Sequence, residues 1–193
     1  MRVIAGEYRS RALDAPAGMA TRPTSDRLRE TLFNVLAPHV QSRPGGARFL
    51  DLYAGSGAVG IEAVSRGAAH VEFVERAAPA LKALRGNLAR LGIVAGVRVH
   101  SVMAAAFLRG AGSVAGFDVV FLDPPYDLAG EYETVLGLLG GSSSGWLADG
   151  ALVIAEHRRK DRLEDVYGLL RKTRVLEQGD ASLSFFRPGT SDE

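Results

Sequence analysis

The 193-residue chain has no cysteine, a net charge of only +1 and no long apolar run. The lack of cysteine excludes disulfides and thiolate metal sites, and it is compatible with a reducing cytoplasm. The four histidines are scattered without metal-ligand spacing, so no metal is expected. No stretch approaches the roughly 18 apolar residues of a membrane span, and Met1 to Gly6 has no apolar signal core. These absences predict a cytoplasmic protein that does not enter a membrane.

The composition is that of an ordinary globular protein, with 47% hydrophobic and 23% charged residues. The length suits one domain with a small extension. The charges are unevenly distributed, because the first 29 residues hold six arginines and three acids. Arginine binds phosphate bidentately and stacks on bases, so this segment is either a nucleic-acid contact or a solvated face. The arginines are Arg2, Arg9, Arg11, Arg22, Arg27 and Arg29.

The glycine-rich stretch from Asp51 to Gly60 lies between a short apolar run at 47–50 and a helical pattern at 59–66. A strand, a tight turn and a helix in this order are the context of a nucleotide-type loop. Glycines at 55, 57 and 60 let the backbone turn tightly, and the N–H groups of the helix start point toward a ligand. We therefore expect a side chain introduced at Gly57 to occupy ligand space.

Two acids indicate which ligand this loop binds. Asp51 ends the first strand, where a carboxylate attracts an ammonium group and repels a pyrophosphate. Glu75 ends the next predicted strand, and an acid about 20 residues past the loop commonly accepts hydrogen bonds from ribose hydroxyls. This pair favours S-adenosylmethionine, which carries an amino-acid head, an adenosine and no phosphate. The literal Gly-x-Gly-x-x-Gly pattern is also compatible with an NAD-dependent oxidoreductase.

Strands and helices alternate from residue 48 onward, which predicts an α/β fold with a mostly parallel, Rossmann-like sheet. A helix with a leucine stripe is predicted at 26–37, capped by Ser25 and ended by Pro38. Two hairpins are expected, one in residues 1–13 and an antiparallel one around Gly179-Asp180. The predicted division is an amino-terminal extension, 1–25, and a main domain, 26–193. Strands are predicted near 48–52, 70–74, 97–100, 117–122 and 150–156, and the clearest helix at 79–91.

The sequence Asp123-Pro-Pro-Tyr126 directly follows a strand that is apolar enough to be buried. The two prolines fix the backbone and remove N–H donors, so the carbonyls there can only accept hydrogen bonds. An acceptor at Pro124 and the Asp123 carboxylate suit an N–H-bearing group such as an exocyclic amine, while Tyr126 offers a flat face to a planar ring. Because the carboxyl ends of parallel strands share one edge of a sheet, Asp51, Glu75 and Asp123 are expected to converge.

These motifs together resemble the class I S-adenosylmethionine-dependent methyltransferases of amino groups. Longer stretches are similar to the bacterial 16S ribosomal RNA guanine-N2 methyltransferase family of the RsmD type. They are Arg2-Val-Ile-Ala-Gly6, the segment from Arg22-Pro-Thr24 to Leu36, and Glu62-Ala-Val-Ser-Arg-Gly-Ala68. The resemblance runs from residue 2 to about 126 and more loosely to the end. It departs after the third strand, where Ser101-Val-Met-Ala104 has no acid or amide for the adenine amino group.

The resemblance implies methyl transfer from S-adenosylmethionine to N2 of a guanine in 16S rRNA, naked or within the small ribosomal subunit, by a monomeric enzyme. It also implies the roles of individual residues. The target amine would be held by Asp123, Pro124, Pro125 and Tyr126, and RNA would be bound by Arg2, Arg9, Arg11 and Arg22. The cofactor would be bound by Asp51, Tyr53, Ala54, Gly55, Ser56, Gly57, Gly60, Glu75, Arg76 and Ala104.

Two further interpretations remain open. Asp-Pro-Pro-Tyr is shared with methyltransferases of adenine N6 and of glutamine amides, and a non-catalytic RNA-binding assembly factor could keep the same fold. The hairpin that carries Arg2, Arg9 and Arg11 is expected to lie outside the methyltransferase sheet, where these arginines cannot reach deep into the cofactor pocket. Deleting residues 1–14 is therefore expected to weaken RNA binding and to leave cofactor binding nearly unchanged.

Overall fold

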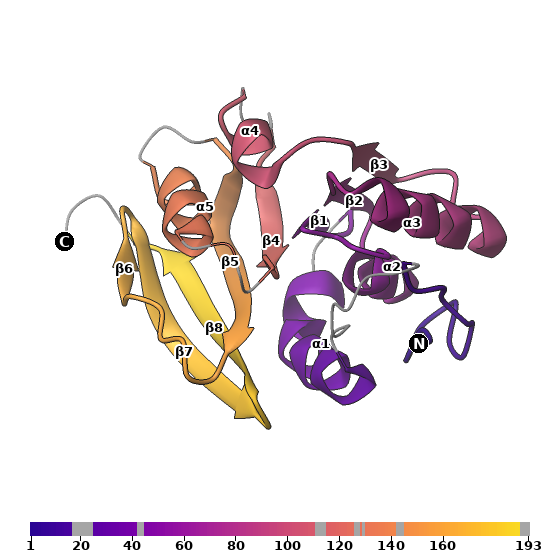
Figure 1. Ribbon diagram of the computed structural model, residues 1–193, viewed down its shortest axis with the longest axis horizontal. Helices are drawn as coiled ribbons and strands as arrows, with labels where there is room; N and C mark the ends of the chain where they lie inside the picture. The colour runs from indigo at the N-terminus through magenta and orange to yellow at the C-terminus, as the bar shows by residue number, and fades with distance from the viewer. Residues whose placement is uncertain are drawn as a thin grey trace. The chain divides into compact units, whose positions relative to one another are not determined.

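The computed structural model describes residues 1–16, 25–41, 45–110, 115–125, 128, 130–141 and 145–189. The chain forms two compact units, Met1–Val102 and Met103–Glu193, and each unit is described by itself (Figure 1). The first unit joins parallel strands to helices, whereas the second joins a parallel strand pair to an antiparallel hairpin. Among the described helices, none is long and apolar enough to cross a membrane.

A parallel sheet forms the centre of the first unit. Strand β2 (His70–Val74) lies between β1 (Arg48–Leu52) and β3 (Val97–His100), as the strand–helix alternation predicts. Helix α2 (Ala58–Ser65) follows β1, and helix α3 (Ala78–Leu91) follows β2. The predicted strand positions are confirmed. Strands β1 and β2 are mostly apolar and buried, whereas β3 alternates valine with Arg98 and His100.

Helix α1 (Asp26–Gln41) begins as predicted but is longer than predicted. The Ser25 hydroxyl oxygen accepts a hydrogen bond from the Leu28 N–H at 3.1 Å, which caps the first turn. The predicted end at Pro38 is wrong, since the helix continues through this proline. Val40 is only 2% exposed, and its burial offsets much of the cost of about 3 kcal/mol that an internal proline carries.

The second unit contains the strand order β4-β5-β8-β7-β6. Strands β4 and β5 are parallel, and every later pair is antiparallel. The hairpin predicted around Gly179-Asp180 is confirmed, while β5 is longer than predicted and the short β6 was not predicted. The strands are β4 (Phe117–Leu122), β5 (Leu147–Arg158), β6 (Val166–Tyr167), β7 (Leu170–Gln178) and β8 (Ala181–Pro188).

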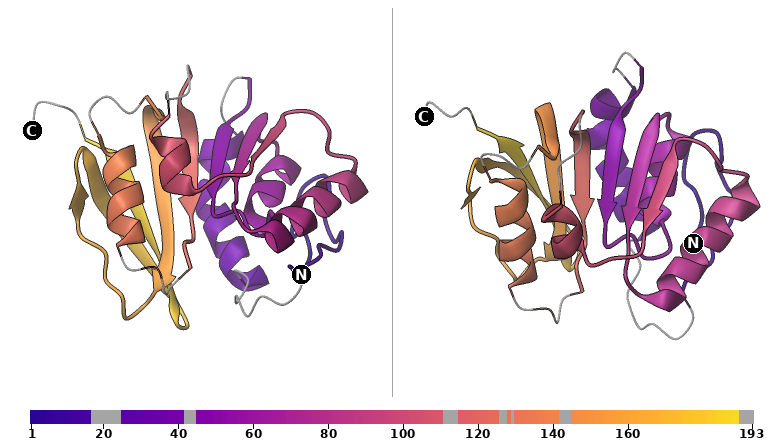
Figure 2. Two further views of the ribbon diagram at one scale, coloured as in Figure 1. Left: turned by 45° about the horizontal axis from the view of Figure 1, so that its top comes forward. Right: turned by 90° about the horizontal axis from the view of Figure 1, so that it is seen from above.

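Helices α4 (Ala104–Leu108) and α5 (Glu131–Leu139) lie over one face of β4 and β5 (Figure 2). Trp146 connects α4 to this sheet, because its indole N–H donates to the Leu108 carbonyl at 2.9 Å and its ring stacks on Phe117 at 6.3 Å between centroids. All six residues of β4 are buried. The carboxyl end of this strand therefore holds the residues that follow it, Asp123 and the two prolines, in a defined position.

Candidate functional site

The loop between β1 and α2 has left-handed backbone at three positions. Tyr53 has a φ of 63°, and Gly55 and Gly57 have φ values of 56° and 81°. This region favours glycine, so a non-glycine residue such as Tyr53 is held there by its surroundings. A hydrogen bond of 2.7 Å from the Gly57 N–H to the Ala54 carbonyl closes the turn. The loop backbone is thus shaped by the protein itself.

Asp51 is only 1% exposed and lies beneath the start of helix α2. Its Oδ2 accepts a hydrogen bond of 2.8 Å from the Gly60 N–H. The N-cap of this helix is Gly57, which has no side chain, so the carboxylate of Asp51 satisfies a helix N–H that the N-cap residue cannot. Burial raises the pKa of the Asp51 carboxyl to about 7. A cation placed beside Asp51 would stabilise its ionised form.

Glu75 connects the end of β2 to the glycine loop. Its Oε2 accepts a hydrogen bond of 2.9 Å from the Gly55 N–H. Its Oε1 accepts hydrogen bonds from the N–H groups of Arg76 and Ala77 at 2.8 and 2.7 Å. A carboxylate has about four lone-pair positions, so the carboxylate of Glu75 can anchor the loop and still accept one ligand hydroxyl. Asp51 and Glu75, the acids at the two predicted strand ends, therefore both contact the backbone of the glycine-rich stretch.

The three glycines of the motif have different environments. A Cβ at Gly57 would lie 2.3 Å from Leu84 Cδ1, and one at Gly60 would lie 2.2 Å from the Phe73 ring. A Cβ at Gly55 would have no atom nearer than the Tyr53 carbonyl oxygen at 4.0 Å. The expectation that a side chain at Gly57 occupies ligand space is therefore wrong, because this position faces the packed side chains of α2, α3 and β2. Gly55 is the glycine that borders open space.

The amino-terminal hairpin forms as predicted, but it docks onto helix α2. Arg2 and Ala12 form an antiparallel bridge. Glu62, fully buried on α2, accepts hydrogen bonds from the N–H groups of Ile4 and Ala5 at 2.7 and 3.0 Å. The amino-terminal segment is too short to form a core of its own. Its backbone N–H groups instead find hydrogen-bond acceptors on α2, the helix that follows the glycine loop.

Two further contacts bring the amino-terminal segment to the glycine loop. The Asn87 side chain, fully buried on α3, donates to the Ser56 carbonyl at 3.0 Å and accepts from the Asp14 N–H at 2.9 Å. The Met1 sulfur lies 3.8 Å from the Ser56 hydroxyl oxygen. The amino-terminal segment therefore packs beside the glycine loop, and the expectation that its arginines do not reach deep into the cofactor pocket stays a prediction. Glu62 and Asn87 were not predicted from the sequence, although Glu62 is the one charged residue of helix α2.

The amino-terminal arginines divide into structural and exposed side chains. Arg29 is fully buried, and its Nη2 donates to the Arg2 carbonyl and to the Asp26 carboxylate, both at 2.7 Å. Burial lowers the pKa of the Arg29 guanidinium below its ordinary value. Arg9 and Arg11 are exposed on the hairpin. Arg29 therefore has a structural role, whereas Arg9 and Arg11 present their charge to solvent.

The Asp-Pro-Pro-Tyr motif begins where β4 ends, in the second unit. Asp123 is half-buried, Pro124 is buried and Pro125 is exposed. The Pro125 carbonyl accepts a hydrogen bond of 3.1 Å from the Leu128 N–H. Ala104, at the start of α4, is buried in the same unit.

Two predicted site residues, Tyr126 and Arg22, lie outside the described residues. The convergence of Asp123 with Asp51 and Glu75 stays a prediction.

Two solved structures share this fold over nearly the whole chain. A protein of Escherichia coli that carries the name of a methyltransferase, yhhF, matches with a TM-score of 0.83 and 36% identity over 98% of both chains. The Thermus thermophilus protein TTHA0928 matches with a TM-score of 0.77 and 32% identity over 96% of this chain and 98% of that one. The α/β fold, with a mostly parallel sheet and antiparallel strands at the carboxyl end, is that of the class I methyltransferases.

The chain belongs to the family described as Conserved hypothetical protein 95, which matches residues 1–187. The Ribosomal RNA small subunit methyltransferase D of Escherichia coli strain K12 is 40% identical over 166 residues, which cover 86% of this chain and 79% of that protein. A Bacillus subtilis protein named as an rRNA methyltransferase, YlbH, is 36% identical over 188 residues, which cover 97% of this chain and 98% of that protein. The family resemblance inferred from the motifs is thus confirmed.

Proposed function

We propose that the protein transfers a methyl group from S-adenosylmethionine to the exocyclic N2 amine of a guanine in 16S rRNA. The observation that carries this proposal is the β1–α2 loop, where buried Asp51 and anchored Glu75 flank the left-handed Gly55. The names of the Escherichia coli and Bacillus subtilis relatives support ribosomal RNA as the substrate. The motifs shared with the RsmD type support guanine N2 as the target and a monomeric enzyme that acts on naked rRNA or on the small subunit.

The glycine loop fits S-adenosylmethionine in three respects. Open space beside Gly55 allows a ligand to approach bare main chain. Asp51, with a pKa raised to about 7, gains a favourable partner in the ammonium group of the cofactor. The carboxylate of Glu75 retains an acceptor position for a ribose hydroxyl, whereas the pyrophosphate of NAD would meet two carboxylates. The other proposed cofactor-binding residues are Tyr53, Ala54, Ser56, Gly57, Gly60, Arg76 and Ala104.

S-adenosylmethionine supplies a methyl group that its sulfonium already activates, so positioning of the amine provides most of the catalysis. The guanine amine is a poor nucleophile, because its lone pair is delocalised into the ring. The Asp123 carboxylate and the Pro124 carbonyl accept hydrogen bonds from the amine and return electron density to its nitrogen. Pro125 stiffens this turn, and Tyr126 stacks on the base.

The proposed extension, residues 1–25, binds RNA through Arg2, Arg9, Arg11 and Arg22. Exposed Arg9 and Arg11 are suited to backbone phosphates. The target guanine has to leave its stack, which costs least in a loop or another single-stranded segment. The main methyltransferase domain comprises residues 26–193.

The test combines calorimetry with a transfer assay. We expect S-adenosylmethionine or its demethylated product to bind and NAD not to bind. With in vitro transcribed 16S rRNA, which carries no modification, we expect labelled methyl to appear in a digest as N2-methylguanosine. Label in N6-methyladenosine would show a different target base. Binding of both cofactor and RNA without any transfer, to naked rRNA or to assembled subunits, would favour the assembly-factor interpretation.

A further inference from the structure

We propose that the exposed loop Arg158–Arg162 is a second RNA-binding surface, which contacts backbone phosphates adjacent to the target nucleotide. This inference rests on the proposed function, since it assigns a further part of the protein to the same RNA. It concerns the second unit alone. The proposed surface lies near the carboxyl ends of β4 and β5, where Asp123 is located, and it is separate from the amino-terminal arginines.

The loop is strongly basic in a chain that is almost neutral. Four of its five residues are cations, and all five are exposed. Residues 158–189 contain eight Lys or Arg against five Asp or Glu, so this segment has a net charge of +3 within a chain of net charge +1. The rest of the chain is therefore slightly acidic, and positive potential is concentrated here. The cations of the loop are Arg158, Arg159, Lys160 and Arg162.

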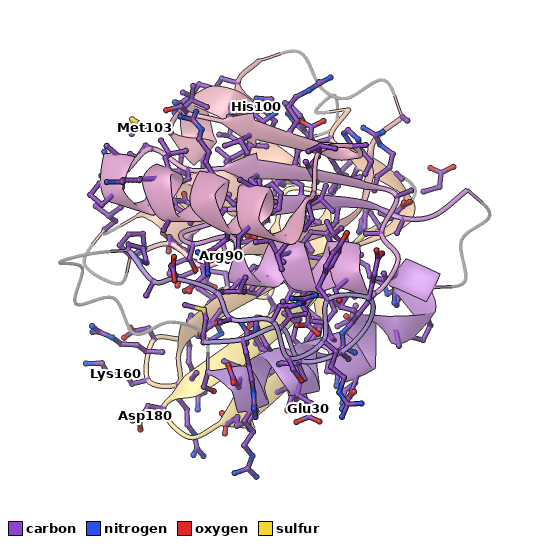
Figure 3. The ribbon with its side chains drawn as sticks, turned by 90° about the vertical axis from the view of Figure 1, so that its right-hand side faces the viewer. Glu30, Arg90, His100, Met103, Lys160 and Asp180 are labelled. Carbon is purple, nitrogen blue, oxygen red and sulfur yellow. The ribbon has the colours of Figure 1, made fainter. Side chains whose placement is uncertain are left out.

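Backbone hydrogen bonds give the loop a defined shape. The Arg159 N–H donates to the Asp180 carbonyl at 2.8 Å, and the Asp161 N–H donates to the Arg158 carbonyl at 3.0 Å. The first of these bonds joins the loop to the β7–β8 turn, and Figure 3 shows Lys160 and Asp180 side by side. The cations are therefore displayed on a folded turn that is connected to the sheet.

Two of the four cations are available to a partner. Arg159 Nε lies 2.9 Å from a Glu177 carboxylate oxygen, so its charge is already paired. Lys160 and Arg162 form no ion pair or side-chain hydrogen bond with the part of the chain that the structure describes. These two side chains can bind phosphate without first breaking an internal contact.

The register of the sheet places this loop at the edge that carries the Asp-Pro-Pro-Tyr motif. Strands β4 and β5 are parallel, and their arrowheads point the same way in Figure 1. Leu122, the last residue of β4, lies opposite Ala155 of β5, and β5 continues to Arg158. Asp123 is therefore level with Glu156, and at roughly 3.3 Å per residue the loop begins about 7 Å beyond that level. A nucleotide held at Asp123 would extend its flanking backbone toward these cations.

The chemistry of the loop favours RNA over a protein partner. Residues 158–162 contain no aromatic or apolar side chain, and such side chains usually anchor protein–protein interfaces. Lys and Arg side chains on an exposed turn are typical of phosphate contacts, which position a nucleic acid without reading its sequence.

The test is a salt titration of 16S rRNA transcript binding by a variant with both Lys160→Ala and Arg162→Ala. The slope of log affinity against log salt should fall by about 1.4, from about 0.7 for each single-strand phosphate contact. Binding at moderate salt should weaken by roughly two- to fivefold per contact, and KM for RNA should rise. Calorimetric cofactor affinity and the unfolding midpoint should remain unchanged, because neither side chain forms an ion pair or hydrogen bond with the described residues.

A matched control removes two exposed cations elsewhere in the same unit, with Arg109→Ala and Arg174→Ala. We expect this pair to change the slope by much less. An equal loss in both variants would indicate net charge alone and would overturn the assignment, as would an unchanged slope in the loop variant of an active enzyme. A wild-type protein that binds no rRNA would overturn both the proposed function and this surface. An unchanged slope in the variant of an active enzyme would overturn the surface alone, so the two outcomes can be told apart.

Discussion

The two units hold their important polar side chains in opposite ways. In the first unit, Asp51, Glu62 and Asn87 are at most 1% exposed and bind backbone groups. In the second unit, the cations of residues 158–162 are exposed. Buried polar groups fix backbone geometry and are costly to remove, whereas exposed charges contribute little to folding. The glycine loop is therefore shaped during folding, while the cations proposed to bind RNA stay solvated in the free protein.

The largest effect should come from Glu62→Ala. It leaves the N–H groups of Ile4 and Ala5 and the guanidinium of Arg66 without their carboxylate. We expect a loss of about 3 kcal/mol in the free energy of unfolding, measured with urea. The control is Glu30→Ala on α1, an exposed acid, for which a loss below about 0.5 kcal/mol is expected. Equal stability of both variants would show that the docking of the hairpin onto α2 contributes nothing to the free energy of unfolding.

A second prediction concerns Asp123, which follows strand β4 in the second unit. Asp123→Ala should slow methyl transfer while cofactor affinity stays the same, because Asp123 is proposed to face the target amine. One lost contact of about 1–3 kcal/mol corresponds to roughly a ten- to hundredfold lower rate if it acts mainly in the transition state. Single-turnover transfer beside calorimetry measures the two quantities, and wild-type turnover in this variant would remove Asp123 from the site.

A third prediction uses the pH dependence of cofactor binding. Below pH 7 the buried Asp51 is protonated in the free protein, since burial raises its pKa to about 7. An ammonium group favours the ionised form, so binding releases a proton and affinity should rise with pH by up to about tenfold per unit, then level off above 7. Asp51→Asn, which keeps an acceptor for the Gly60 N–H, should bind more weakly and lose this dependence. Calorimetry between about pH 5 and pH 8 measures it, and a parallel rise in both proteins would point to another group.

The smallest effect is expected from Arg9→Ala combined with Arg11→Ala. Both side chains are exposed, so stability and cofactor affinity should stay near wild type, and the RNA salt slope should fall by about 0.7 per contact. Point changes are needed here, because deleting residues 1–14 would leave Glu62 buried without its backbone donors. The comparison variant carries Lys82→Ala and Arg85→Ala on α3. A reduced slope only in that variant would make α3, and not the hairpin, the RNA contact.

Local patterns predicted most of the secondary structure. The strands at 48–52, 70–74, 97–100 and 117–122 have the predicted bounds, because three are short, mostly apolar runs and the one at 97–100 alternates valine with polar residues. The predicted end of the helix at residue 91 was also correct, and the φ of 70° at Gly92 explains why glycine ends α3. The end of α1 was wrong, because burial of Val40 lies outside the local rule that a proline ends a helix. The two-residue strand β6 is too short for any periodic signal.

The types of residue at the candidate site can be read from the amino-acid sequence. It contains an acid before the glycine loop, an acid after the next strand and an Asp-Pro-Pro-Tyr motif, and each of them suits a particular part of a ligand. How the two acids act depends on the packing of the folded chain. It buried Asp51 under a helix start, made Glu75 an anchor of Gly55 and turned Gly57 toward Leu84.

Long-range contacts explain what the sequence could not show. Glu62 and Asn87 meet the amino-terminal segment across more than 50 residues of chain, and no local periodicity reports such a contact. The position of the Arg158–Arg162 loop near Asp123 follows from the register of β4 and β5, which the sequence alone does not show. Propensity and spacing act over a few residues, whereas burial, the pKa of Asp51 and the neighbours of a surface loop depend on which distant segments pack together.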